Sequence, residues 1–263
     1  MLSWKRFQTT EFQAVVGQSL ALPWATVMSS HDNPGHYMGN CIFVDAAVPP
    51  PSSEDLDAAE AIARSGHCRV VYQFIDAQQV PAPYSSAWTS TLSARGLAVE
   101  TTPAWLLCYD LSELPTTVQA VHETRVLTNV DEIIASDGGA SPYNADAWLR
   151  HLRLKQLALG ERYGCFVASV DPATQASVGL VSLHVADGTT AVVNWCGVPE
   201  GHRRRGHARA AILRALTYAR DVCQCQHVLL TAVEEGPIRL YESVGFRIID
   251  QGNEVQGLGS LDA

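Results

Sequence analysis

The sequence lacks several features that would place it in a special class of proteins. No window approaches the ~20 consecutive apolar residues that a membrane-spanning helix needs. Charged residues make up 17% and hydrophobic residues 47%, which is unlike a disordered chain. An excess of positive charge is also missing, since 18 Lys and Arg against 27 Asp and Glu give a net charge of -9. Such a surface repels phosphate backbones and acidic lipids on average. These absences predict a folded protein with no membrane partner and no nucleic-acid partner.

A disulfide framework and a regular metal-ligand spacing are absent too. The seven cysteines are an odd number at irregular intervals in 263 residues, which predicts free thiols. Cys223-x-Cys225-x-His227 brings three candidate metal ligands together, but it has no second ligand pair and alternates as a strand does. We therefore expect no metal site.

The one stretch similar to a targeting segment is the run 14–28, which follows Lys5 and Arg6. Glu11 stands in its approach and Pro23 breaks it, so the pattern predicts no signal peptide. The expected location is the reducing cytoplasm.

The length allows one large domain or two, and strand-like runs alternate with helix-like runs, which predicts an α/β protein. The expected strands are 39–45, 68–75, 98–111, 166–170, 178–185, 191–196, 228–233 and 246–250. The expected helices are 52–66, 85–94, 145–159, 206–220 and 237–244. Residues 114–117 are the expected linker, and the glycine-rich tail after Gly252 is expected to be loosely attached.

The strongest signal for a binding site is the segment 194–209. A predicted strand ends near Gly197, three arginines follow at 203–205, and a helix begins at Gly206 with Ala208 in its first turn. The first N–H groups of a helix lack partners and lie at the positive end of its dipole, so this arrangement predicts an anion site that fits a diphosphate. The alternative is a solvated basic turn. Positive charge is unfavourable at a helix start, which favours the anion site.

The spacing Arg203-x-x-Gly206-x-Ala208 after a strand resembles the Q/R-x-x-G-x-G/A acetyl-coenzyme A signature of the GNAT N-acetyltransferases. Pro199-Glu200 stands where that family often has Pro-Glu, although the distance from Pro199 to Gly206 is one residue longer than in the commonest family form.

A second motif supports the resemblance. Leu240-Tyr241-x-x-x-Gly245-Phe246 is similar to the family's L-Y-x-x-x-G-F and follows the loop, one helix and one strand later. The resemblance covers about 117–251. It implies the α+β GNAT fold, a mixed and centrally splayed sheet flanked by helices.

The resemblance also implies an activity, the direct transfer of an acetyl group from acetyl-coenzyme A to a primary amine of a small molecule or peptide. Backbone and side-chain groups around the arginine loop are expected to hold the diphosphate, and the end of the preceding strand is expected to hold the pantetheine arm and polarise the thioester. The first set is Arg203, Arg204, Arg205, Gly206, His207, Ala208 and Arg209, and the second is Cys196, Gly197 and Val198.

Tyr241 is expected, from the family motif, to protonate the departing thiolate, with a core tyrosine as the alternative. Glu234 and Glu235 are the candidates for the general base, but two adjacent side chains cannot both point the same way. His184 and Asn194 are weaker alternatives for this role. A covalent route through Cys196 is disfavoured, because its flanks carry no acid–base partner and buried strand cysteines are usually small hydrophobes.

The first half of the chain follows a similar order of elements without the same chemistry. Gly96-Leu97 follows a helix as Gly245-Phe246 does, but Leu92 stands where the second half has Tyr241. The segment 52–55 carries acidic residues that would repel a diphosphate. We predict a degenerate GNAT-like domain without a donor site at 1–115 and a catalytic domain at 116–263. The alternative for the first half is an unrelated α/β cap. In either case it would pack against the catalytic half and help wall the acceptor cleft.

Two other functions stay open at this point. The chain could be a non-catalytic coenzyme A-binding regulator, or a nucleic-acid module that uses the arginine loop. The acceptor, the acyl-chain preference and a homodimer are equally open.

Overall fold

The computed structural model describes residues 13–64, 70–77, 83–118, 120–137 and 147–259. The chain divides into two compact units. Unit 1 contains 1–106 and 249–263, and unit 2 contains 107–248. Strands β5 (Ala98–Asp110) and β11 (Arg247–Leu258) each begin in one unit and end in the other. The first segment of unit 1 ends at 106, whereas the sequence predicts a boundary at 115/116, and unit 1 also includes most of the last strand of the chain.

Unit 1 is built on strands β1 to β4 and the C-terminal part of β11. β1 (Gln18–Leu22), β2 (Ala25–Ser29) and β3 (Ile42–Val44) pair antiparallel in that order. β3 then pairs parallel with β4 (Val71–Ala77), through the crossover helix α2 (Ser53–Arg64). Helix α3 (Ser85–Ala94) follows β4. The apolar run 14–28 is therefore mostly an antiparallel hairpin, which the sequence did not predict.

The core of unit 1 lies between the sheet and its two helices. Leu56 from α2 and Trp88 from α3 are buried in one cluster with Tyr72 and Phe74 of β4. Trp88 stacks at a tilt on Trp24, with 5.7 Å between ring centroids. Apolar residues recur at every third or fourth position on the helices and at every second position on the strands. This spacing places them on the face of each element that is buried in the core.

The expectation of a loosely attached tail was wrong. Residues 252–258 pair antiparallel with 71–77, and Val255 is 4% exposed in the core of unit 1. The glycines and polar residues of this segment hide the alternation of apolar and polar side chains that is typical of a strand. Pairing with β4, far away in the sequence, makes it a strand.

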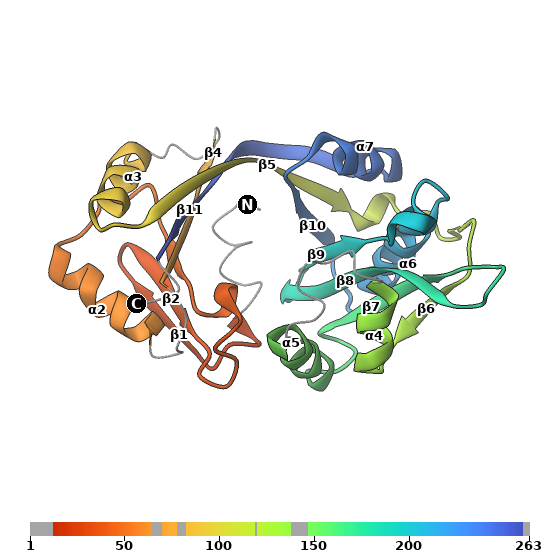
Figure 1. Cartoon of the computed structure of the whole chain (residues 1–263). Helices are drawn as coiled ribbons and strands as arrows, with labels where there is room; N and C mark the ends of the chain where they lie inside the picture. The colour runs from red at the N-terminus through yellow and green to blue at the C-terminus, as the bar shows by residue number, and fades with distance from the viewer. Residues whose placement is uncertain (1–12, 65–69, 78–82, 119, 138–146, 260–263) are drawn as a thin grey trace. The chain divides into compact units, whose positions relative to one another are not determined.

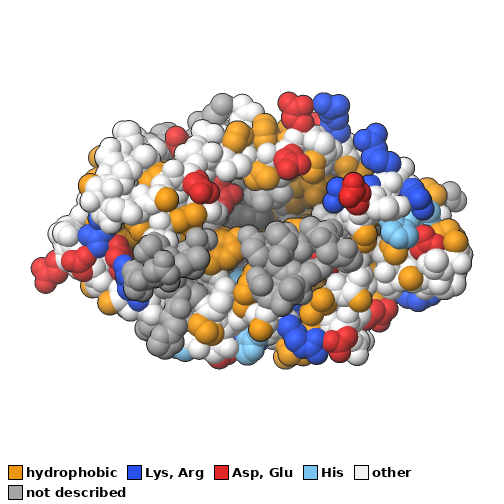
Figure 2. All heavy atoms as spheres, in the orientation of Figure 1, with side chains coloured by type: hydrophobic (Ala, Val, Ile, Leu, Met, Phe, Trp, Pro, Cys, Tyr) orange, Lys and Arg blue, Asp and Glu red, His pale blue; other side chains and the backbone are white. Residues whose placement is uncertain are grey.

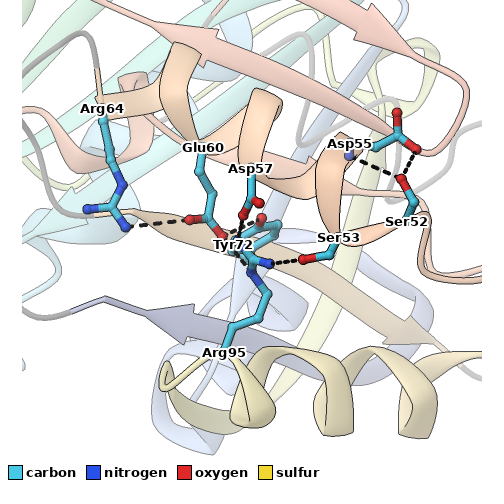
Figure 3. A network of polar contacts seen from close by, with 8 residues as sticks. All are labelled: Ser52, Ser53, Asp55, Asp57, Glu60, Arg64, Tyr72 and Arg95. Carbon is cyan, nitrogen blue, oxygen red and sulfur yellow. Dashed lines mark hydrogen bonds and ion pairs between the residues drawn. The ribbon is translucent and has the colours of Figure 1, made fainter.

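A buried carboxylate joins α2, β4 and the end of α3 (Figure 3). Glu60 accepts hydrogen bonds from the Tyr72 hydroxyl at 3.0 Å and from Arg95 Nε at 2.9 Å. Arg64 pairs with the same carboxylate at 3.4 Å. The burial of Tyr72 and the charge of Glu60 raise the pKa of this tyrosine well above its ordinary value. Glu60 therefore acts as a structural acceptor.

Unit 2 contains an antiparallel meander extended by a parallel strand. β6 (Thr124–Leu127), β7 (Gly164–Val170), β8 (Ser177–Asp187) and β9 (Thr190–Gly197) pair antiparallel in sequence order. β10 (His227–Ala232) then pairs parallel with β9. The turn predicted at Asp187-Gly188 is confirmed, and the Asp187 carboxylate accepts from the Thr189 N–H at 2.9 Å.

The described residues of unit 2 form four α-helices, which are labelled in Figure 1. They are α4 (Val130–Asp137), α5 (Ala147–Ala158), α6 (His207–Asp221) and α7 (Glu235–Val244). α4 and α6 both pack on β8, and Ile133 of α4 is buried with Phe166 and Leu180. The predicted fold class, a mixed α/β sheet flanked by helices, is thus confirmed. None of the helices in the described part of the chain is long and apolar enough to cross a membrane.

Candidate functional site

The end of β9 leaves backbone groups open on one side. The pairing of β9 with β10 runs from Thr190 to Val193 on the β9 side. On the other side, Trp195 pairs with Ser182 and Val193 with Leu183, so Asn194 is the extra residue of a β-bulge. Residues 195–197 stay paired with β8, while the described residues show no pairing between them and β10. Their edge toward β10 can therefore bind an extended ligand through the backbone.

Gly179 of β8 allows the end of β9, at Gly197 and Val198, to lie very close to the backbone of β8. Its φ is +73°, and a Cβ there would lie 3.0 Å from Cγ2 of Val198 and 3.3 Å from the carbonyl oxygen of Gly197. It is also the extra residue where the register of β7 and β8 shifts. A side chain at this position would push Gly197 and Val198 out of place.

The start of α6 is open. Gly206 is its N-cap, with φ +92° and no side-chain cap, and the N–H of Ala210 donates to the carbonyl of Gly206 at 3.0 Å. The N–H groups of residues 207–209 precede this bond, so they have no partner within the helix. The predicted helix start at 206 is confirmed, together with its lack of internal capping.

The arginines of the predicted set differ in their contacts. Arg203 donates from Nε to the carbonyl of Val198 at 2.9 Å, and Arg209 donates to the carbonyl of Ser243 at 2.7 Å. Arg204 and Arg205 are exposed, and the described residues include no hydrogen-bond or ion-pair partner for either side chain. Two arginines thus hold the loop and α7 in place, and two are available to an anion.

His207 points its side chain into the protein. It is 2% exposed, its Nδ1 lies 2.9 Å from the Ser169 hydroxyl, and its ring stacks on His122 at 4.2 Å. His122 Nε2 lies 2.6 Å from the carbonyl oxygen of Arg205, which requires that this nitrogen donate. Burial, followed by the neighbouring histidines, lowers the pKa of His207. Only the backbone of His207 is therefore available at the helix start.

Asp171 anchors the loop from the end of β7. One of its carboxylate oxygens accepts from the N–H groups of Ala173 and Thr174, at 2.8 and 3.0 Å. The other lies 3.2 Å from His202 Nδ1. These N–H groups, and the nearby imidazole, lower the pKa of Asp171. Asp171, His202 and His207 place potential metal-ligand atoms within 4.8 Å of one another. The sequence did not predict this group, because the three residues do not follow a regular metal-ligand spacing.

Tyr241 and the end of β9 come together. Tyr241 of α7 is 7% exposed, and its hydroxyl lies beside the Cys196 side chain and interacts with it. Burial, and then Cys196, raise the pKa of Tyr241 well above its ordinary value. Burial likewise raises the pKa of Cys196 to about 12. Both groups are therefore protonated at neutral pH, as a proton-donating phenol must be and a nucleophilic thiolate cannot be.

The two candidate bases lie in different settings at the start of α7. Glu235 is exposed and pairs with Arg239 at 3.1 Å, one turn further along the helix. Glu234 is the exposed N-cap residue and makes no side-chain cap. Of the weaker alternatives, His184 is 2% exposed and stacks on Tyr163. Asn194 lies at the bulge, with its Oδ1 buried and without a partner.

The sequence did not indicate Asp137, because the helix α4 that carries it was not predicted. Asp137 is 1% exposed and accepts from Trp195 Nε1 at 2.6 Å. Its charge contributes to the raised pKa of Cys196. Nearby, Arg153 lies over the ring of Phe166 at 5.2 Å. The end of β9 therefore has a buried carboxylate beside it.

The sequence model of the acetyltransferase (GNAT) family matches residues 130–246. Residues 130–246 form a GNAT acetyltransferase domain. All of the predicted site residues, from Cys196 to Tyr241, lie inside this match, and all of unit 1 lies outside it. A search among curated proteins returned no match.

Solved structures share the fold of the chain at low sequence identity. A GCN5-related N-acetyltransferase from Kribbella flavida has a TM-score of 0.66 at 16% identity, covering 97% of this chain and 95% of its own. A functionally unknown conserved protein from Staphylococcus epidermidis has a TM-score of 0.63 at 14% identity, covering 95% and 98%. A tandem GNAT protein from the clavulanic acid biosynthesis pathway has a TM-score of 0.55 at 16% identity, covering 84% and 76%. The GNAT domain is thus part of a chain whose fold is shared almost from end to end with known proteins.

Proposed function

We propose that the GNAT domain transfers an acetyl group from acetyl-coenzyme A directly to a primary amine of a small molecule or peptide. The observation that supports this proposal is the position of Tyr241 beside Cys196, at the strand end that leads into the open start of α6. It brings the two sequence motifs to one place. Unit 1 is proposed to be a degenerate GNAT-like domain without a donor site.

The donor would bind along the loop and the strand end. Its diphosphate would accept from the N–H groups of residues 207–209 and pair with Arg204 and Arg205. Its pantetheine arm would add to the open edge of β9 at residues 196–198. An N–H at this edge, aimed at the thioester oxygen, would stabilise the charge that develops there, and one such donor is worth ~10²–10³ in rate.

In the transfer itself the neutral amine attacks the thioester carbonyl, the C–N bond forms and the C–S bond breaks. The leaving sulfur takes the proton of the Tyr241 hydroxyl, and the amine nitrogen gives up its proton to a base. Glu234 is the better candidate for that base, directly or through water, because Glu235 is engaged with Arg239. A covalent acetyl-cysteine is disfavoured, since the raised pKa of Cys196 keeps its thiol protonated.

The test is a screen of primary amines that follows free thiol release from acetyl-coenzyme A, with Tyr241→Phe beside the wild type. We expect kcat to fall ~10²- to 10⁴-fold in the variant, with the Kd for acetyl-coenzyme A unchanged. Tyr218→Phe is the matched control. Tyr218 is equally buried, but its hydroxyl donates to the carbonyl of Glu161 in the same unit.

An unchanged kcat in Tyr241→Phe would rule out Tyr241 as the acid. If the wild type binds acetyl-coenzyme A but turns over no amine, the chain is a coenzyme A-binding regulator instead.

A further inference from the structure

Unit 1 contains a polar cluster on the sheet face opposite its core. Val255 of β11 is buried with the residues of α2 and α3. Successive side chains on a strand point to opposite faces, so Glu254 and Gln256 point the other way. Gln256 lies directly opposite Gln73 of β4 in the antiparallel register. Glu254, Gln73 and Gln256 therefore share this face, and we call them the Glu254 cluster.

The hydrogen bonds of the cluster leave acceptors unused. Gln73 Nε2 and Gln256 Nε2 donate to the same oxygen, Oε1 of Glu254, at 2.6 and 2.8 Å. The structure records no partner for the other carboxylate oxygen within the described residues. Gln73 is 4% exposed, and its own Oε1 is buried without a partner. A buried polar atom without a partner is rare in a folded protein and calls for a ligand or water.

Among the described residues of unit 1, the charge of Glu254 also has no recorded counterion. No ion pair or cationic donor is recorded for it in the parts of the chain that the structure describes. Burial accordingly raises the pKa of Glu254, despite the two amide donors. Burial, and then the same charge, raise the pKa of Cys41, the residue directly before β3. A half-buried carboxylate of this kind is costly unless a cation arrives.

We propose that the Glu254 cluster binds the ammonium group of a small organic amine. An ammonium donates three hydrogen bonds and carries the missing charge, so it satisfies the second oxygen of Glu254 and Oε1 of Gln73 together. Glu254 is only partly buried, which leaves it within reach of a ligand. A divalent metal ion fits less well, because the cluster offers one carboxylate and Ca²⁺ or Mg²⁺ favours several charged oxygens.

This site depends on unit 1 alone and stands whether or not the GNAT domain transfers acetyl groups. Its test therefore uses the full chain without acetyl-coenzyme A. Butylammonium chloride is titrated by calorimetry, with 1-butanol and potassium chloride as probes of the apolar tail and of ionic strength. We expect saturable binding of butylammonium alone, at least tenfold weaker in Glu254→Gln.

Glu54→Gln is the matched control, because Glu54 is an exposed carboxylate on α2 of the same unit. It should bind butylammonium as the wild type does. Gln73→Leu removes the buried acceptor and keeps the charge of Glu254, and it should weaken butylammonium binding severalfold. If Glu254→Gln does not fold, Gln73→Leu tests the proposal in its place, and unchanged binding in this variant overturns it.

The proposal is overturned if the wild type shows no saturable binding, if potassium chloride gives the same heats, or if Glu254→Gln binds as tightly as the wild type. In each of these cases acetyl-coenzyme A binding, measured separately, still reports on the proposed function of the GNAT domain.

Discussion

The helices α2 and α6 occupy equivalent places in the two units, but their first turns differ in capping and in charge. Each links two parallel strands, β3 to β4 and β9 to β10. At α2, the Ser52 hydroxyl accepts from the N–H of Asp55 at 3.2 Å (Figure 3). Glu54 and Asp55 place negative charge at the helix start. At α6, Gly206 offers no cap and the neighbouring side chains are cationic.

Under the proposed function, the difference means that the β-α-β topology does not by itself make an anion site. The start of α2 is satisfied by its own side chains, and no anion is needed or tolerated there. The start of α6 is left unsatisfied, and its approach is fixed by Asp171 and His202 in a loop that carries the cations.

The largest effect is expected from giving α6 the charge of α2. Ala208 is the second residue of α6, as Glu54 is of α2. Ala208→Glu places a carboxylate where the diphosphate would bind, and we expect the Kd for acetyl-coenzyme A to rise about 100-fold. The free energy of unfolding should rise by about 0.5 kcal/mol, because an acidic residue suits a helix start. Calorimetry and denaturant titration measure the two quantities.

Ala208→Gln is the control for size, and it should weaken binding much less than Ala208→Glu. Equal losses in both variants would mean that shape, and not charge, decides binding at this helix.

A smaller effect is expected from removing the two free cations. Arg204→Gln combined with Arg205→Gln should raise the Kd for acetyl-coenzyme A about tenfold and reduce the dependence of binding on salt, because exposed charges act through a screened potential. Arg150→Gln, an exposed arginine on α5 of the same unit, should change neither quantity. Binding that is insensitive to Arg204 and Arg205 would make this loop an ordinary basic turn.

Removing the cap of α2 should affect stability alone. Ser52→Ala deletes the hydroxyl that accepts from the Asp55 N–H, and we expect the free energy of unfolding to fall by about 1 kcal/mol. The Kd for acetyl-coenzyme A should not change. Ser93→Ala, at an exposed position inside α3, is the control. A loss of donor affinity in Ser52→Ala would contradict the view that only α6 binds the donor.

The smallest effect, none at all, is expected from metal chelation. Asp171, His202 and His207 lie close enough for a metal ion, but the Asp171 carboxylate already accepts from two backbone N–H groups and His207 Nδ1 lies 2.9 Å from the Ser169 hydroxyl. EDTA should therefore leave kcat and Tm unchanged. A loss of both that zinc restores would show that the loop before α6 is held by a metal.

Much of the architecture could be predicted from short-range patterns. The helix at 85–94 was predicted at its observed bounds, and α6 was predicted to within one residue at each end. The reason is that apolar spacing and stop signals are local properties of the chain. The hairpin β1–β2, the helix α4 and the C-terminal half of β11 were missed. Their sequences are short or polar, and they take their form from partners distant in the sequence.

The sequence by itself determined the acidic start of α2, the open start of α6 and the order of the two motifs, because caps, charges and spacing are written in neighbouring residues. Only the tertiary structure decided which arginines are free, that Tyr241 meets Cys196, and that Asp137 lies beside Trp195. It also decided that Glu254 shares a sheet face with Gln73. Each of these depends on strand register or helix packing, which joins residues far apart in the chain and which local preference does not fix.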